Sequence, residues 1–129
     1  MKFGMRKELA LSFDDALARI PEALKTEGFG VLTEIDVQDT LRKKLGVEFR
    51  RYRILGACNP QLAHQALSTQ LEIGLLLPCN VIVYEEPGGR SVVAAVDPLA
   101  TIAATGGDDL RELAATVRAS LERVLARIG

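Results

Sequence analysis

The order of strand-like and helix-like segments along the chain predicts an α+β fold. Apolar residues alternate with polar ones in several short segments, which is the period expected of strands with one buried face. Between these segments, apolar residues recur at spacings of three and four, which indicates helices with one buried side. A chain of 129 residues with this pattern and no internal repeat has the size of a single domain, residues 1–129.

The first predicted strand covers residues 3–11. Its buried face is expected to carry Phe3, Met5, Leu9 and Leu11. A helix follows from Ser12, whose hydroxyl can cap it, to about Glu27. Pro21 lies inside this helix, where proline removes a backbone donor, so we expect a kink or a break there.

A second strand is predicted over residues 29–35. Its apolar face is expected to carry Phe29, Val31 and Ile35. Asp36 can then cap a short helix that ends at Gly46. The third strand is predicted over residues 51–57, with both faces of its apolar end buried.

The segment Cys58-Asn59-Pro60 predicts the start of a helix over residues 59–72. Asparagine is a favoured N-cap, and proline suits the first helical position, where its missing N–H costs nothing. The inward side of this helix is expected to carry Ala63, Ala66, Leu67 and Leu71.

The remaining chain predicts a hairpin and a final helix. Nearly continuous apolar residues at 81–84 and 91–96 flank a Pro-Gly-Gly turn, which predicts two adjacent strands. Apolar residues at alternating spacings of three and four predict a long helix over residues 108–128 that lies along the sheet.

Composition restricts the possible partners. Sixteen basic and seventeen acidic side chains leave a net charge of −1, so the chain has no overall attraction to nucleic acid or to anionic membranes. The longest apolar run, residues 73–84, is interrupted and is shorter than the roughly twenty residues that span a bilayer. Two cysteines without a preceding signal segment favour free thiols in a reducing cytoplasm.

The two cysteines are the leading candidates for a site. Cys58 directly precedes a predicted helix N-terminus, which can stabilise a thiolate, and Cys79 follows Pro78. Asn59 and Asn80 would flank the sulfurs with amide groups. Buried structural cysteines beside turn-forming residues explain the same pattern equally well.

Two kinds of chemistry are open to these thiols. Reversible oxidation of Cys58 and Cys79 requires their Cα atoms to lie within about 7 Å. A metal set of Cys58, Cys79 and His64 would suit zinc or copper, but no paired ligand spacing supports it, and His64 is expected to face solvent.

A basic segment is the one local departure from neutral charge. It contains Arg42, Lys43, Lys44, Arg50, Arg51 and Arg53, opposed by Glu48. Such a segment can bind nucleic acid or another anion, but it is also typical of a solvated helix face followed by a charged edge strand. Because the whole domain is not basic, we do not expect nucleic-acid binding. Motifs for phosphate loops, dinucleotide binding and serine catalytic triads are absent from the sequence.

Three segments resemble the bacterial family called domain of unknown function 302. They are residues 27–36, 54–60 and 75–81, which contain both cysteine motifs. The resemblance implies a TATA-box-binding-protein-like fold, in which an antiparallel sheet of about five strands is packed by two main helices. It also implies that the third and fourth strands are antiparallel neighbours, which would bring both sulfurs to one end of the sheet, and that the protein forms homodimers. It implies no activity, because fold alone does not determine chemistry.

These observations leave three hypotheses about function. The first is a small ligand-binding or sensing domain, with a site near Cys58 and Cys79. The second is a thiol-dependent enzyme with Cys58 as the nucleophile. The third is a structural or protein-interaction module that dimerises through the helix at residues 108–128.

Overall fold

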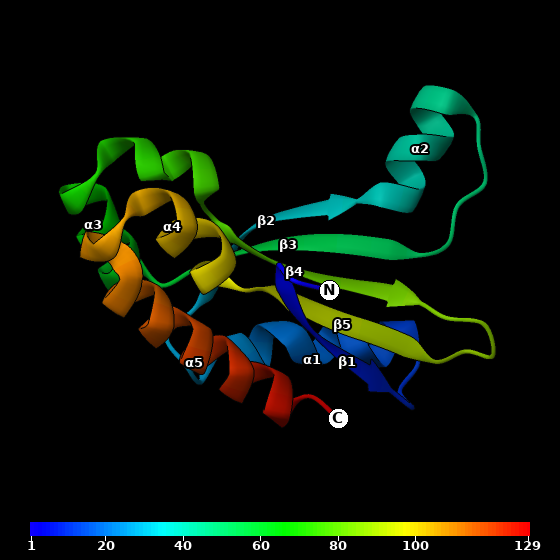
Figure 1. The fold of residues 1–129 in the computed structure, drawn as a ribbon. Coiled ribbons are helices and arrows are strands. Elements are labelled where there is room, and N and C mark those ends of the chain that lie inside the picture. The colour runs from blue at the N-terminus through cyan, green and yellow to red at the C-terminus, as the bar shows by residue number, and fades with distance from the viewer.

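The protein is described by a computed structural model that covers the backbone of residues 1–129 and all side chains except those of residues 105 and 106. Five antiparallel strands form one sheet in the order β1-β5-β4-β3-β2 (Figure 1). The strands are β1 (Gly4–Leu9), β2 (Gly30–Asp36), β3 (Tyr52–Cys58), β4 (Cys79–Glu85) and β5 (Ser91–Val96). The predicted α+β class and the antiparallel sheet are confirmed.

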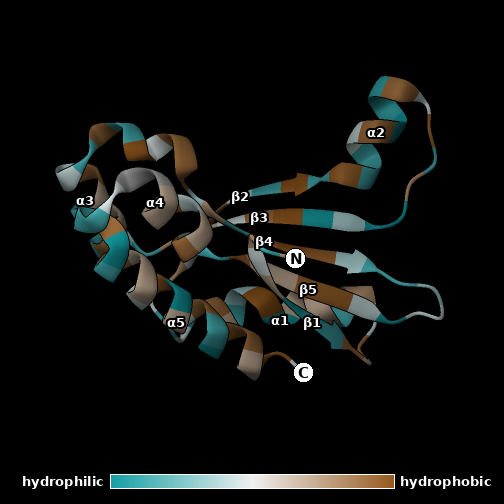
Figure 2. Cartoon of the chain, in the orientation of Figure 1, coloured by the Kyte–Doolittle hydropathy of each residue, from teal (hydrophilic) through white to brown (hydrophobic). Residues whose placement is uncertain are grey.

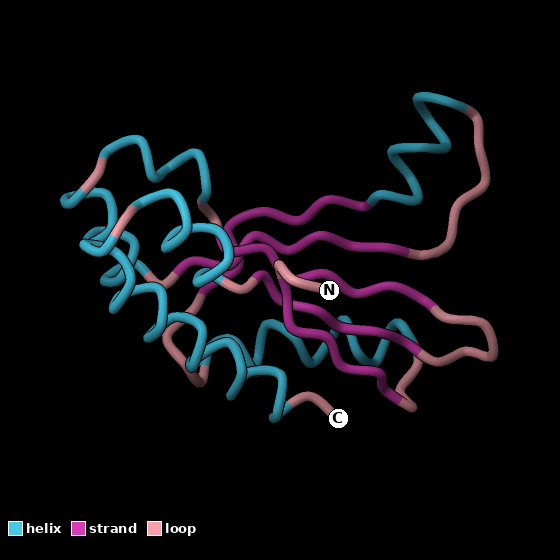
Figure 3. The backbone as a smooth tube through the Cα atoms, in the orientation of Figure 1, coloured by secondary structure: helices cyan, strands magenta, loops and turns pink.

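Helices cover one face and one end of this sheet. They are α1 (Phe13–Lys25), α2 (Val37–Leu45), α3 (Pro60–Thr69), α4 (Pro98–Gly106) and α5 (Arg111–Arg127), with short 3-10 helices η1 (Leu71–Leu76) and η2 (Asp108–Leu110). Figure 3 shows α3 and α4 gathered at one end of the sheet, whereas α2 projects from the opposite end. The helical layer is therefore thickest where β3 ends and β4 begins.

The main core lies between the sheet and the pair of helices α1 and α5. Alternate residues of the strands point toward these helices, as the period of two requires. The buried residues of the central strands on this face include Leu55, Ala57, Val81, Val83 and Val93. Figure 2 shows the corresponding hydrophobic stretches along the central strands. Burial of one sheet face against two helices accounts for the stability of this part of the fold.

A second, smaller core holds the additional helices at the end of the sheet. It contains Ala66, Ile73, Ile102, Ala103, Leu110 and Ala114. Helix α4 contributes two of these residues and was not predicted. Its start repeats the pattern at Asn59-Pro60, because the Asp97 side chain accepts a hydrogen bond of 2.9 Å from the Leu99 amide and Pro98 opens the helix.

Two predicted strand faces are corrected by the structure. Phe3 precedes β1 and is exposed, so it does not join the buried face. In β2, the register with β3 shifts between Val31 and Thr33, which marks a β-bulge. Because a bulge inserts one extra residue, Val31 stays on the helix side, whereas Ile35 is on the opposite face and is exposed.

The helix predictions need two corrections. Helix α1 continues through Pro21, so the predicted break is wrong, whereas the alternative of a kink stays a prediction. Pro21 is on the exposed side, where water can solvate the carbonyl group that loses its donor. The helix predicted over residues 59–72 ends at Thr69, and the following 3-10 helix turns Leu71 outward, so that this side chain is 79% exposed.

Candidate functional site

A cavity of about 310 Å³ lies at the end of the sheet where β3 ends and β4 begins. Its wall is built by residues of β3, α3, η1, β4, α4 and α5, together with the segment that leads into β2. Representative wall residues are Ala57, Cys58, Ala66, Leu77, Cys79 and Ala114. The additional helices therefore enclose a space at the sheet end that α1 and α5 alone would leave open.

The sequence Cys58-Asn59-Pro60 turns the chain sharply from β3 into α3. The Asn59 Oδ1 atom accepts a hydrogen bond of 3.2 Å from the Leu62 amide, which caps the helix as predicted. The Asn59 Nδ2 atom donates to the Glu27 carbonyl oxygen at 3.4 Å. This one side chain therefore ties the start of α3 to the turn that precedes β2.

The two cysteines lie at the same end of the sheet, as expected. Cys79 is directly opposite Ala57 in the antiparallel ladder, so it is next to Cys58 on the neighbouring strand. Successive residues of a strand point to opposite faces, so the Cβ atoms of Cys58 and Cys79 leave the sheet on opposite sides. Both line the cavity, which extends around the sheet end, and both are free thiols. A disulfide between them would require the backbone to move, because it needs facing Cβ atoms.

The environments of the two thiols differ. Burial, and to a smaller extent the neighbouring Cys58, raises the pKa of the Cys79 thiol to about 11. Cys79 is therefore protonated at neutral pH, which makes it a poor nucleophile and a poor metal ligand. Cys58 is half-buried and is the more accessible of the two sulfurs.

The other candidates near the cysteines lie outside the cavity wall. His64 is exposed on α3, as predicted, and Asn80 is exposed on β4 opposite Gly56. Among the side chains that the structure describes, no three histidine, cysteine or acidic residues come together to hold a metal ion. The suggested zinc or copper set of Cys58, Cys79 and His64 therefore does not form such a group in this structure, in which His64 is exposed.

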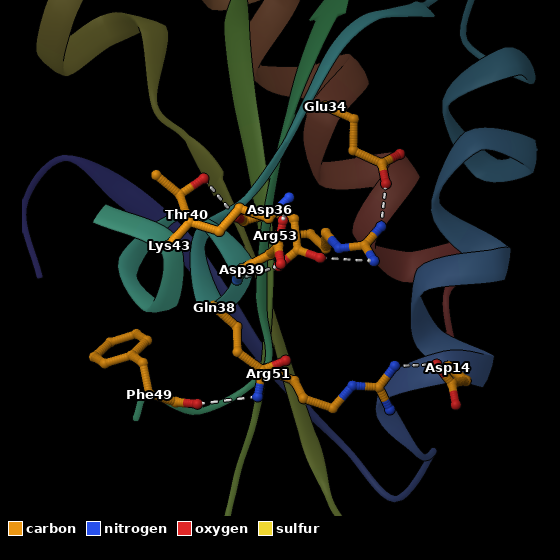
Figure 4. A network of polar contacts seen from close by, with 10 residues as sticks. All are labelled: Asp14, Glu34, Asp36, Gln38, Asp39, Thr40, Lys43, Phe49, Arg51 and Arg53. Carbon is orange, nitrogen blue, oxygen red and sulfur yellow. Dashed lines mark hydrogen bonds and ion pairs between the residues drawn. The ribbon is translucent and has the colours of Figure 1, made fainter. Parts of the chain in front are cut away.

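Carboxylates compensate most of the basic segment. Arg53 pairs with Glu34 and Asp36 on the adjacent strand, and Arg51 reaches Asp14 at the start of α1 at 2.5 Å (Figure 4). The remaining pairs are Lys43 with Asp39 at 3.0 Å and Arg50 with Glu86 at 3.2 Å. Arg42 and Lys44 are exposed on α2. The segment is thus divided between a projecting helix and a strand whose arginines stabilise the sheet.

The small residues of the cavity wall are what sequence reasoning missed. Ala66 was placed on the inward face of its helix, where a small side chain is usual, and Ala114 was not singled out; nothing in the spacing of either residue signals an empty volume. Helix α4, which supplies Ile102 to the wall, was missed entirely. The Asp97-Pro98 cap was the one signal that could have revealed it.

The fold is that of a small α+β domain with one antiparallel sheet and a mostly apolar cavity at the sheet end. The chain belongs to the family described as "Domain of unknown function DUF302", whose model matches residues 5–128. It is also similar to the solved structure of an uncharacterized conserved DUF302 protein from Bacillus stearothermophilus, with 32% identity, a TM-score of 0.91 and full coverage of both chains. No curated protein matches the chain. None of the helices in the described part of the chain is long and apolar enough to cross a membrane.

Proposed function

We propose that this protein is a ligand-binding domain whose site is the cavity beside Cys58 and Cys79. The observation that carries the proposal is the cavity itself, because about 310 Å³ falls within the range of small-molecule sites in proteins. Its wall combines many apolar side chains with a few polar groups, which is the usual composition of such sites.

The packing around the space supports this proposal. Protein interiors are normally close-packed, so a space of about 310 Å³ lined mostly by apolar side chains is a departure from ordinary packing. Four small residues from four elements keep it open: Ala57, Ala66, Gly74 and Ala114. Larger apolar residues at these positions would fill the space, so their absence favours a site that an occupant fills.

The same wall argues for binding over catalysis. A thiol-dependent enzyme would use Cys58 as its nucleophile and needs a base to activate it. The described wall residues include no histidine, lysine or acidic side chain. A reducing, cytoplasmic location remains a prediction, which cell fractionation would test.

A pair of alanine variants on α5 tests the site. Ala114 is buried in the wall, whereas Ala115 is exposed on the same helix. A library of small neutral compounds is titrated into the protein and followed by amide NMR shifts. We expect hits to shift the amides of Cys58 and Ala66, to bind Ala115→Leu normally, and to bind Ala114→Leu weakly. Hits that bind both variants equally, or a complete lack of hits, would remove the proposal.

We also infer that the protein forms a homodimer through the sheet face opposite α1 and α5. This face carries half-buried apolar residues, among them Tyr52, Ile54, Ile82 and Tyr84, and the two tyrosine rings stack at 5.5 Å. Helix α2 projects beyond the sheet and has no buried residue, although it carries hydrophobic positions (Figure 2). Apolar surface left open in this way is typical of an interface.

The oligomeric state of two charge variants tests the dimer. Ile35 is exposed on the open face, and Leu71 is exposed on η1, which is not part of the sheet. We expect Ile35→Lys to shift the protein from dimer to monomer in light scattering, while Leu71→Lys leaves the dimer intact. A wild-type protein that is monomeric at all concentrations would contradict the inference. If the protein instead dimerises through α5, as the hypothesis of an interaction module states, Ile35→Lys should have no effect on the dimer.

A further inference from the structure

The chemistry of the cavity wall restricts what the ligand can be. None of the described wall residues carries a charge. The one amide among them, Asn59, accepts from the Leu62 amide at Oδ1 and donates to the Glu27 carbonyl from Nδ2, which leaves one N–H and one lone pair for a ligand. A buried charge of a ligand would lose its hydration without gaining an oppositely charged partner, which is unfavourable. Most of the buried part of the ligand is therefore apolar.

The size of the cavity limits how much of the ligand it can hold. An apolar cavity of about 150 Å³ is known to take up one benzene molecule. At about 310 Å³, the cavity has roughly twice that space, which suits an apolar group of roughly ten to twelve carbon atoms.

The wall favours an alkyl chain over an aromatic system. Phe29 is the single aromatic residue among the described wall residues, and pairs of aromatic rings are a main source of preference for aromatic ligands. The rest of the apolar wall is aliphatic and includes Leu62, Leu67, Leu77, Ile102, Leu113 and Val117. Such a surface packs against methylene groups in any rotation of the chain.

The entrance to the cavity indicates where the polar end of the ligand lies. Leu32 lines the cavity and is 67% exposed, so the cavity reaches the surface beside β2. On the other side, η1 contributes Gly74 to the wall. The exposed part of the wall at Leu32 is therefore apolar, and no cationic residue among the described wall residues is present to attract a carboxylate or a phosphate.

We propose that the cavity binds a linear alkyl chain of roughly ten carbons whose polar head is uncharged and remains in water at the entrance. This inference rests on the proposed ligand-binding function and specifies its ligand class. The alkyl chain fills the space that Ala66 and Ala114 leave, and it covers the Cys58 side of the wall.

A series of linear alcohols tests the inference without any mutation. Hexan-1-ol, octan-1-ol, decan-1-ol and dodecan-1-ol are titrated into the wild-type protein and followed by amide NMR shifts. We expect affinity to rise about fourfold for each added CH₂ up to decanol and then to level off, because further carbons extend into solvent. Decanoate is expected to bind no more tightly than decanol. Decanol is also expected to slow the alkylation of Cys58 by N-ethylmaleimide.

The cavity variants show where the alcohols bind. We expect Ala114→Leu to weaken decanol binding by about tenfold or more and Ala115→Leu to leave it unchanged. If Ala114→Leu fails to fold, Ala66→Leu fills the same cavity from α3. Decanol binding that survives in both cavity variants would overturn the inference.

Other ligands separate this inference from the proposed function. The comparison compounds are 2-naphthol and adenosine, as aromatic and polar probes. If one of them binds in the cavity and decanol does not, the binding function holds and the alkyl assignment is wrong. Affinities that do not depend on chain length, or a strong preference for decanoate, would also overturn the assignment. If no probe shifts the cavity amides, both proposals fall.

Discussion

Replacing Cys79 with alanine should change how the stability of the protein depends on pH. The pKa of this thiol is about 11 in the folded protein, compared with 9.0 for an ordinary thiol, because the sulfur is buried. As pH rises above about 9, the unfolded chain loses this proton first, so the unfolded state is favoured. The contribution of the buried thiol is thus complete below about pH 9 and is lost as pH approaches about 11.

The size of this effect follows from the two pKa values. One pKa unit corresponds to about 1.4 kcal/mol, so the free energy of unfolding should fall by about 2 kcal/mol between about pH 8 and about pH 10.5 because of this group alone. Tyr52, whose pKa is also raised by burial, titrates in both proteins and cancels in the comparison.

Urea unfolding under reducing conditions, followed by circular dichroism, measures the effect. The free energy of unfolding of wild type is compared with that of Cys79→Ala at several pH values. The difference between the two proteins should shift by about 2 kcal/mol in favour of the variant as pH rises over this range. A difference that stays constant would show that the Cys79 thiol is not desolvated, and the description of the cavity wall would be wrong.

Three further predictions concern the residues around the sheet end and the basic segment. Gly56→Ala should lower the free energy of unfolding by roughly 1–3 kcal/mol in the same urea assay, because a Cβ there would lie 2.7 Å from Pro78 Cγ and would also meet Thr33. Gly30→Ala is the matched control, because a Cβ at Gly30 has nothing within 4 Å, and it should be neutral or stabilising. Asn59→Ala should cost about 1 kcal/mol through the lost helix cap and should accelerate hydrogen exchange in α3, and unchanged exchange would contradict that role. Duplex DNA should not bind the protein at physiological salt in fluorescence anisotropy, because carboxylates pair with most of the basic segment. Tight binding would contradict this prediction and would show that the basic residues of α2 are sufficient to bind DNA.

The sequence was sufficient for those parts of the fold that depend on local pattern. The hairpin strand at residues 91–96 was predicted with its observed bounds, and Asn59 was correctly identified as a helix cap. The face of Ile35 was wrong because a bulge depends on how β2 pairs with β3, which no period within one strand reveals. Helix α4 was missed because it is held by contacts with α5 and η1 and lacks a strong amphipathic pattern of its own.

The site was less predictable than the fold for a related reason. The cysteine motifs mark the correct end of the sheet, because turns and caps are encoded locally. The cavity exists because small residues on α3 and α5, far apart in the chain, face the same volume. Empty space is a property of the assembled packing, so single residues such as Ala66 and Ala114 carry no local signal for it.

The two thiols that first indicated a site now raise two separate questions. Cys79 is buried beside Ala57 and its thiol has a raised pKa, so at neutral pH it acts as a small apolar residue of the cavity wall. Cys79→Ala should therefore have little effect on the proposed binding of a ligand in the cavity. Cys58 is more accessible and lies beside the cap of α3, so any reaction with an electrophile or oxidant should occur there. Because the two Cβ atoms lie on opposite faces of the sheet, modification of Cys58 should proceed as a single-thiol event. A two-cysteine redox centre needs both sulfurs on one face, so this geometry argues against such a centre and is compatible with the proposed binding site, in which Cys58 is the more accessible thiol.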